Sequence, residues 1–156
     1  MNTRGKLERK AAYTAYSTAK YKHVYFDERT GGYLVIEHQR IAQGKRNKQE
    51  QEKFEKEYGM CTVLAKNGYA VEYLKEIQGR YDILLNGVPA DLKKTASHNN
   101  ILDYAGRAVY RQGARAVVFE LEKETAYIKN RLKTLKEAGI PVKYYFSNNP
   151  AKVMDL

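Results

Sequence analysis

Residues 81–94 read YDILLNGVPADLKK, and this stretch decides how the sheet is built. Two apolar runs flank Asn86-Gly87, a dipeptide that favours a two-residue β-hairpin turn because both residues tolerate a positive φ. Counting outward from the turn places Asp82 directly opposite Asp91 on one face, with their Cβ atoms ~5 Å apart. Two like charges at such positions destabilise a sheet unless a cation lies between them. The hairpin therefore raises the question of what neutralises these two carboxylates.

Three arrangements answer that question. In the first, Arg80 and Lys93 neutralise the acids in a solvated ladder of salt bridges. In the second, the carboxylates bind a divalent metal, since hard oxygen ligands from adjacent strands suit Mg²⁺ or Mn²⁺. In the third, the two acids form an acid/base pair of the kind that glycosidases use, for which the sequence offers little further support.

A helix before the hairpin contributes a third acid. Residues 47–67 predict this helix, with Gly68 as its C-terminal stop. Glu57 lies one turn from Cys61 and points the same way as the apolar stripe, so its carboxylate needs a partner. Glu57 is either a rim residue or the ion-pair partner of a lysine, or it converges with Asp82, Asp91 and Lys93 on a metal site. The stripe consists of Phe54, Tyr58, Cys61, Leu64 and Ala65.

The whole chain reads as an α/β protein with a central mixed sheet. Residues 1–22 predict a helix, residues 23–38 a β-hairpin, and residues 39–49 a polar loop or linker. We therefore expect residues 1–46 to form an accessory element and residues 47–156 to form the main domain. From residue 47 onward the predicted order is α-β-β-β-α-β-α-β, with helices flanking the sheet.

The composition points to a polyanionic partner. The formal net charge is +10, with a sequence pI near 9.5, and such a field favours nucleic acid through phosphate contacts and counterion release. A basic surface kept for solubility, or for holding an acidic protein such as an inhibitor, is the alternative. No apolar run approaches the ~20 residues of a membrane-spanning helix, and no signal peptide is visible. We expect a cytosolic protein, or one that another module delivers.

The motif residues resemble the PD-(D/E)xK nuclease superfamily with its restriction-endonuclease-like core. The likeness lies in the glutamate-bearing helix, in YDILLNG with Asp82, and in ADLK with Asp91 and Lys93. EYGMCTVLAKNG, from Glu57 to Gly68, resembles the E-x-x-A-x-x-x-L-x-x-x-G helix of many members. More narrowly, the chain from GGYLVIEH through KKTASHNNI to VVFEL is similar to C-terminal nuclease domains of contact-dependent inhibition toxins. It is also similar to toxin-like tails of phage head-morphogenesis proteins.

The resemblance implies a metal-dependent nuclease that hydrolyses phosphodiester bonds. Asp82 and Asp91 would hold Mg²⁺ or Mn²⁺, with Glu57 as a ligand directly or through water. Lys93 would orient the attacking water or neutralise the phosphate. The toxin-like resemblance favours structured RNA such as tRNA and implies an acidic immunity protein as a partner.

Other functions and other site residues stay open. The alternatives are a DNA endonuclease of the same fold, a non-catalytic nucleic-acid-binding or protein-interaction module, and a metal-independent ribonuclease using His98 or His38. Lys94, Thr95 and His98 follow the motif strand and are candidates for phosphate contact, as is Gln112 at the end of the next helix. Structural roles are favoured for two of them: a surface or capping role for His98, and that of a helix-end polar residue for Gln112. Candidates for stacking on unpaired bases are Tyr13, Tyr16 and Tyr21.

Overall fold

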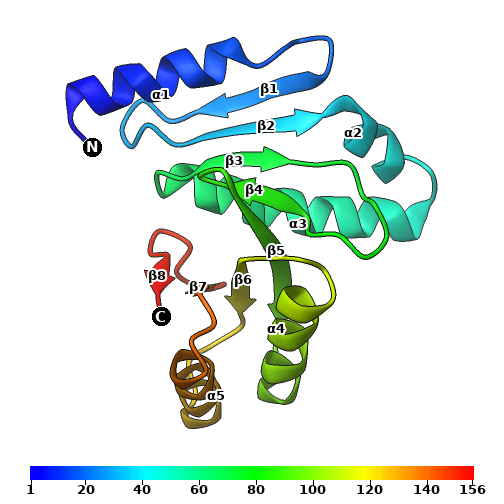
Figure 1. The fold of residues 1–156 in the computed structure, drawn as a ribbon, viewed down its shortest axis with the longest axis vertical. Coiled ribbons are helices and arrows are strands. Elements are labelled where there is room, and N and C mark those ends of the chain that lie inside the picture. Colours follow the sequence, from blue (N-terminus) through cyan, green and yellow to red (C-terminus); the bar gives the residue numbers. More distant parts are fainter. The chain divides into compact units, whose positions relative to one another are not determined.

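The computed structural model describes all 156 residues, which fold into two compact units. The first unit comprises residues 1–77 and 82–87, and the second comprises residues 78–81 and 88–156. The domain boundary expected after residue 46 lies inside the first unit. The strand β2, before this position, pairs with β3, after it. Figure 1 labels the helices and strands of both units. No helix has the length and apolarity that crossing a membrane requires.

The first unit combines three helices with a four-stranded mixed sheet. The strands lie in the order β1-β2-β3-β4; β2 runs antiparallel to β1 and parallel to β3, and β4 runs antiparallel to β3. The predicted N-terminal helix and the hairpin that follows it are both present. The elements are α1 (Thr3–Ala15), β1 (Tyr21–Phe26), β2 (Tyr33–Glu37), α2 (His38–Gly44), α3 (Lys48–Lys66), β3 (Ala70–Tyr73) and β4 (Ile83–Leu85).

The β2 strand is the centre of the first unit, and all five of its residues are buried. Tyr33 and Val35 lie in one apolar cluster with Tyr13 of α1. Because side chains alternate along a strand, Leu34 and Ile36 face the other side of the sheet. We infer that α3, which also contacts β2, covers that side. A strand covered on both faces has a continuous apolar sequence, as YLVIE has.

The α3 helix has the predicted ends. Asn47 is its N-cap, with Oδ1 accepting a hydrogen bond from the Glu50 backbone N–H at 2.9 Å. Gly68 follows the last turn with a φ of +94°, a conformation that favours glycine. Glu57 is buried on the inner face of this helix, as the apolar stripe predicted.

The prediction of a loop over residues 39–49 was wrong, because α2 occupies the first half of that stretch. Its sequence is polar, yet the helix lies close against α3. A Cβ added at Gly44 would lie 2.8 Å from the Cβ of Phe54, so only glycine permits this approach. Arg40, on the same short helix, is 1% exposed. The polar sequence of this segment predicted a solvent-exposed loop, because arginine is rarely buried unless it is paired with an acid.

The turn after β4 has the conformation that Asn86-Gly87 predicted. Asn86 has a φ of 49° and Gly87 a φ of 80°, the positive values that a type I′ turn requires. Asp82 lies one residue before the first residue of β4. Asp82 and Asp91 belong to different units, and their direct opposition stays a prediction.

The second unit also contains a four-stranded mixed sheet, in the order β5-β6-β7-β8. The first three strands are parallel, and β8 runs antiparallel to β7. The predicted order of elements is confirmed, with a short 3-10 helix and the strand β8 in addition. The elements are β5 (Val88–Thr95), η1 (His98–Asn100), α4 (Ile101–Tyr110), β6 (Ala116–Leu121), α5 (Ala126–Glu137), β7 (Val142–Phe146) and β8 (Met154–Asp155).

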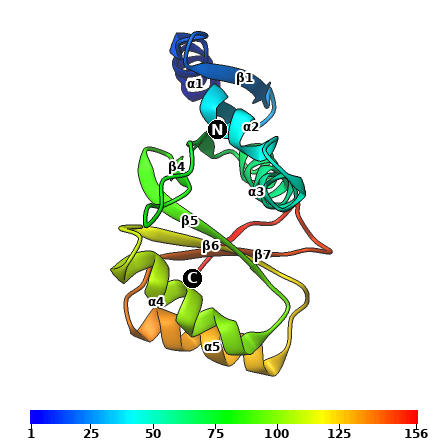
Figure 2. The ribbon, with the colours of Figure 1, turned by 90° about the vertical axis from the view of Figure 1, so that its right-hand side faces the viewer.

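The two helices of the second unit share one apolar core with its sheet. Figure 2 shows α4 and α5 side by side along the parallel strands. Alternate residues of β6, Val117 and Phe119, are buried in one cluster with Ile101 of α4 and Ile128 of α5. The chain is therefore a mixed α/β protein with helices flanking the strands, as the sequence predicted.

Candidate functional site

Asp91 is the central residue of the second unit's candidate site. It lies on β5, paired in parallel with Val117 of β6, and its neighbours Ala90 and Leu92 are buried as well. The Asp91 side chain is 0% exposed, and neither of its carboxylate oxygens has a hydrogen bond. Since buried polar groups almost always have such partners, this carboxylate needs a special explanation.

Lys93 is the cation beside this carboxylate. Its Nζ lies 2.8 Å from the Asp91 Oδ2, although the contact is not aligned as a hydrogen bond, so Lys93 supplies mainly charge. The same ammonium donates to the Gln112 Oε1 at 3.4 Å and lies 5.7 Å from the centre of the Tyr104 ring. Its side chain is 21% exposed. The Lys93 ammonium thus contacts Asp91 and two residues from the region of α4.

The environment of Asp91 fits a hard metal ion. A carboxylate buried without donors is costly, and a single misaligned ammonium offsets part of that cost. Within each unit, no group of three or more His, Cys, Asp or Glu side chains gathers in a way that could hold a metal ion. Mg²⁺, however, commonly binds through one or two carboxylates and completes its shell with water and substrate phosphates. Asp91 suits the role of one such carboxylate ligand.

Glu57 occupies a different kind of site in the first unit. The side chain is 4% exposed. Its Oε1 accepts hydrogen bonds from Arg40 Nη2 at 3.2 Å and from the Tyr73 hydroxyl at 2.8 Å. Both donors bind the same oxygen and fix the rotamer of the carboxylate. The expected inward orientation is confirmed, but the ion-pair partner is an arginine on α2 and not a lysine at the rim.

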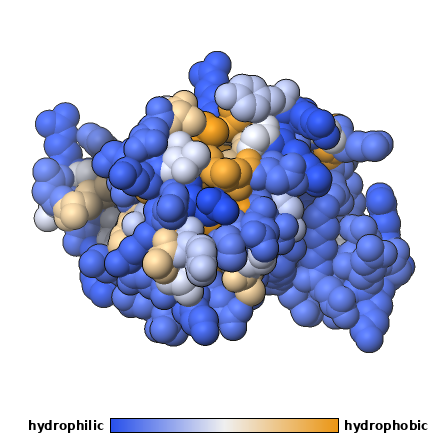
Figure 3. Space-filling model, turned by 90° about the horizontal axis from the view of Figure 1, so that it is seen from below, coloured by the Kyte–Doolittle hydropathy of each residue, from blue (hydrophilic) through white to orange (hydrophobic).

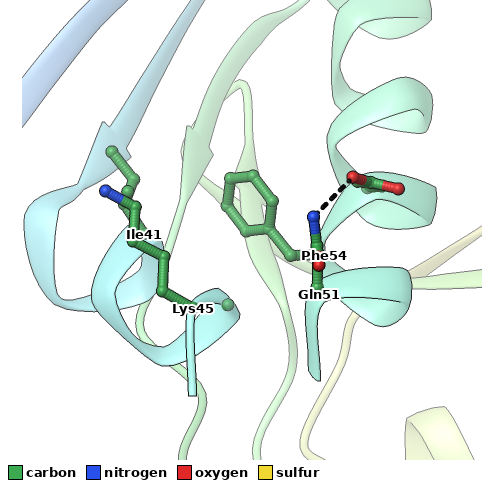
Figure 4. Close-up of a pocket in the computed structure, with 6 residues that line it drawn as sticks. Ile41, Lys45, Gln51 and Phe54 are labelled. Atoms are coloured by element: carbon green, nitrogen blue, oxygen red, sulfur yellow. Dashed lines mark hydrogen bonds between the residues drawn. The ribbon is translucent and has the colours of Figure 1, made fainter. Parts of the chain in front are cut away.

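Aromatic rings surround the buried Arg40 guanidinium. It lies 5.5 Å from the centre of the Phe54 ring and 5.1 Å from that of Tyr73. Burial opposes the charge of Arg40, but Tyr73 and Glu57 outweigh it and raise the pKa of the guanidinium. Figure 4 shows Phe54 reaching from α3 toward α2, beside a surface hollow of about 340 Å³ that Ile41 also lines. The Arg40 guanidinium therefore stays charged, and its ion pair with Glu57 is shielded from water.

The charges of Glu57 and Asp82, the two candidate acids of the first unit, shift the pKa values of the same neighbouring side chains. Burial, followed by the charges of Glu57 and Asp82, raises the pKa of the Cys61 thiol well above its ordinary value. Burial lowers the pKa of Lys53, but a hydrogen bond to Glu76 and the charges of Glu57, Glu76 and Asp82 outweigh it and raise the pKa overall. Glu57 and Asp82 therefore share one electrostatic neighbourhood. Cys61 is a buried neutral thiol, as its helical spacing predicted.

Three secondary candidates have partners within the second unit. Lys94 forms a 2.9 Å ion pair with Glu120. Burial raises the pKa of Glu120, but hydrogen bonds from Tyr145, Lys94 and Ser147 lower it more, and the pKa lies below its ordinary value. Thr95 is buried, and its hydroxyl accepts from the Ser97 backbone N–H at 3.1 Å. Gln112 lies just beyond the end of α4, where it reaches Lys93.

The predicted aromatic stacking residues of the N-terminus are engaged inside the first unit. The Tyr16 and Tyr21 hydroxyls both donate to the Glu72 carboxylate. Tyr13 packs between neighbouring rings, with Tyr33 at 5.5 Å between ring centres. His98, by contrast, stacks on a tyrosine that the sequence did not single out: its ring centre lies 4.7 Å from that of Tyr127, at an interplanar angle of 18°.

Comparison with known proteins adds one finding. No protein-family model matches the sequence, and no curated protein matches it. The fold is shared with one chain of a toxin and immunity complex. A chain of the CdiA-CT/CdiI toxin and immunity complex from Burkholderia pseudomallei superposes with a TM-score of 0.54 and 16% identity, over 72% of this chain and 89% of that chain. At this identity the likeness establishes the fold.

Proposed function

We propose that this chain is a metal-dependent nuclease in which Asp91 is the central metal ligand. The observation that carries the proposal is the fully buried Asp91 carboxylate, which has no hydrogen bond to either oxygen and a single ammonium at 2.8 Å. Strongly unfavourable burial of an ionisable group is typical of sites where a ligand supplies the missing charge. The net charge of +10 and the resemblance to the PD-(D/E)xK motif support the same function.

The proposed roles follow from the residue types. Asp91 would hold the metal. The resemblance assigns metal-ligand roles to Asp82 and Glu57 as well, but the Glu57 Oε1 already accepts hydrogen bonds from Arg40 and Tyr73. A divalent ion, when bound, supplies Lewis-acid polarisation of the phosphoryl group and acidification of a water. Lys93 presents its ammonium to a phosphate oxygen and stabilises the charge that grows there during hydrolysis. Gln112 holds the lysine side chain in place for that contact.

We further propose a toxin-type role with RNA as the substrate. The fold shared with a chain of a toxin and immunity complex supports this role. A toxin domain of this kind enters a target cell as part of a larger protein, and an acidic immunity protein would neutralise it by binding the basic surface. Structured RNA such as tRNA is the preferred substrate, and DNA is the alternative.

One experiment tests the activity and separates its rivals. The pure protein is incubated with tRNA, single-stranded DNA and duplex DNA, each with Mg²⁺, with Mn²⁺ and with EDTA. We expect cleavage of RNA that EDTA and Asp91→Ala both abolish, while Asp91→Ala retains binding. The matched control is Asp103→Ala, since Asp103 is an exposed acid that pairs only with Arg107 one turn away. Cleavage that persists in EDTA would contradict the proposal and favour a metal-independent ribonuclease.

A non-catalytic binding module is the second candidate. The Asp91–Lys93 ion pair favours it, because such a pair also serves as a purely structural contact. This module would bind nucleic acid or a protein and would show no metal-dependent cleavage of any substrate. Binding that is equally tight in wild type and Asp91→Ala, with no cleavage by either, would establish it.

A further inference from the structure

The stacked rings of His98 and Tyr127 form an exposed aromatic step on the second unit. The ring planes differ by 18°, and the ring centres are 4.7 Å apart. Tyr127 is 66% exposed, so its ring has a face that the protein does not cover. Large aromatic side chains are often buried, and single exposed apolar residues are common on protein surfaces. Two stacked rings at the surface are a less common feature and need a separate explanation.

The fold places this step beyond the carboxyl ends of two neighbouring parallel strands. Thr95, the last residue of β5, pairs in register with Leu121, the last residue of β6. His98 follows β5 closely, and Tyr127 lies in the first turn of α5, directly after β6. Both rings therefore lie beyond the carboxyl ends of neighbouring parallel strands. The motif residue Lys93 lies on the same strand that leads to His98.

The surroundings suit a nucleotide. Arg131 follows Tyr127 by four residues in α5, so the two residues lie on the same face of the helix, and an arginine there suits a phosphate beside a stacked base. The loop before α5 has mixed charge, with Lys123 between Glu122 and Glu124. Electrostatic attraction alone would therefore not bind a polyanion here, and stacking on the aromatic rings would have to contribute. Figure 3 shows apolar side chains gathered within a hydrophilic surround on the face that α4 and α5 form. Other exposed apolar residues of these helices are Leu102 and Tyr110.

We propose that the Tyr127 ring, backed by His98, is a stacking platform for an unpaired nucleobase of the nucleic-acid substrate. This inference rests on the proposed function, and it narrows the substrate to one with single-stranded or flipped-out nucleotides. Every base has an aromatic face, so such a platform accepts many sequences. The tyrosines that the sequence offered as candidates for this role, Tyr13, Tyr16 and Tyr21, pack their rings against other tyrosines of the first unit.

A fluorescence titration tests the platform directly. The chain has no tryptophan, so Tyr127→Trp introduces a single reporter at the step. We expect single-stranded RNA or DNA oligonucleotides to quench this reporter in EDTA, and abasic strands of the same length and blunt duplexes to leave it unchanged. Tyr110→Trp is the matched control, because Tyr110 is 79% exposed on the neighbouring helix with no stacked ring. Quenching in both variants, or in neither, would overturn the proposal.

Affinity measurements separate stacking from a structural role. Tyr127→Ala should weaken binding of single strands by about tenfold, as the loss of one base–aromatic contact does, whereas Tyr127→Phe should retain it. Unchanged affinity in Tyr127→Ala would contradict the platform and would point to a protein-docking face instead. All of these measurements are made without metal, so they do not depend on cleavage. Cleavage by wild type with no quenching would leave the nuclease proposal intact and reject the platform.

Discussion

Two buried carboxylates, one in each unit, have opposite surroundings. Glu57 in the first unit receives hydrogen bonds from Arg40 and Tyr73. Asp91 in the second unit has no hydrogen bond to either oxygen. Both acids belong to the motif that the sequence suggested, and both are less than 5% exposed. The difference shows that burial alone does not identify a ligand site, because Glu57 has two protein donors and Asp91 has none.

The largest difference should appear when each acid is replaced. Glu57→Ala leaves the Arg40 guanidinium buried and unpaired, so we expect the free energy of unfolding to fall by about 3–5 kcal/mol. Asp91→Asn removes a buried charge that Lys93 offsets only in part, and should leave stability unchanged or raise it when no metal is present. Urea denaturation of both variants at neutral pH in EDTA checks the pair. Equal losses of unfolding free energy in the two variants would show that the two buried carboxylates do not differ in this way.

Removing the cation beside Asp91 should have an intermediate effect. Lys93→Met removes the ammonium that pairs with the Asp91 carboxylate, and we expect a loss of about 1–2 kcal/mol in EDTA. This is less than for a fully buried pair, because Lys93 is one-fifth exposed and poorly aligned. Combining Lys93→Met with Asp91→Asn should restore the stability. A double variant that is no more stable than Lys93→Met would argue against a repulsive environment at Asp91.

A smaller effect is expected at the hydroxyl that binds Glu57. Tyr73→Phe removes one of two hydrogen bonds to the Glu57 Oε1 and keeps the ring. We expect a loss of about 1 kcal/mol, the usual net contribution of a single hydrogen bond. The shift of the urea midpoint measures it, with Tyr110→Phe at an exposed position as the control. No change in the midpoint would mean that Arg40 alone holds the carboxylate.

The smallest effect concerns the dependence of stability on pH. Because the pKa of Glu120 is lower in the folded chain than the ordinary value of 4.5, its contribution is present above that pH and is lost as the pH falls below it. Glu120→Gln should therefore lose less stability than wild type between pH 6 and pH 3. Thermal unfolding at both pH values tests this, with the exposed Glu122→Gln as the control. An identical acid dependence in wild type and Glu120→Gln would show that the pKa is not lowered.

The local patterns of the sequence predicted most of the fold. Asn47 and Gly68 marked the ends of α3, Asn86-Gly87 predicted the turn, and the apolar run of β6 predicted a buried strand. These features depend on residues that are close in the chain. The α2 helix was missed because its burial depends on a charge pair with α3, and polarity alone indicates solvent.

The candidate site was predicted in part. The inward orientation of Glu57 followed from helical spacing, and the proximity of Lys93 to Asp91 followed from strand alternation. Arg40, Tyr73 and Tyr127 were not found, since each meets its partner only through tertiary packing. No spacing rule relates the sequence positions of Tyr127 and His98, and their stacking depends on how β5 and β6 end at the same edge.

Metal-dependent stabilisation is the most direct test of whether Asp91 is a metal ligand. The midpoint of thermal unfolding is measured while Mn²⁺ is titrated, for wild type, for Asp91→Asn and for the control Asp103→Asn. A specific site stabilises the folded state by about 2.7 kcal/mol at a free metal concentration of 100 Kd. We predict that the midpoint rises in wild type and in Asp103→Asn and does not rise in Asp91→Asn. Equal shifts in all three proteins, or no shift in wild type, would contradict the assignment of Asp91 as a metal ligand.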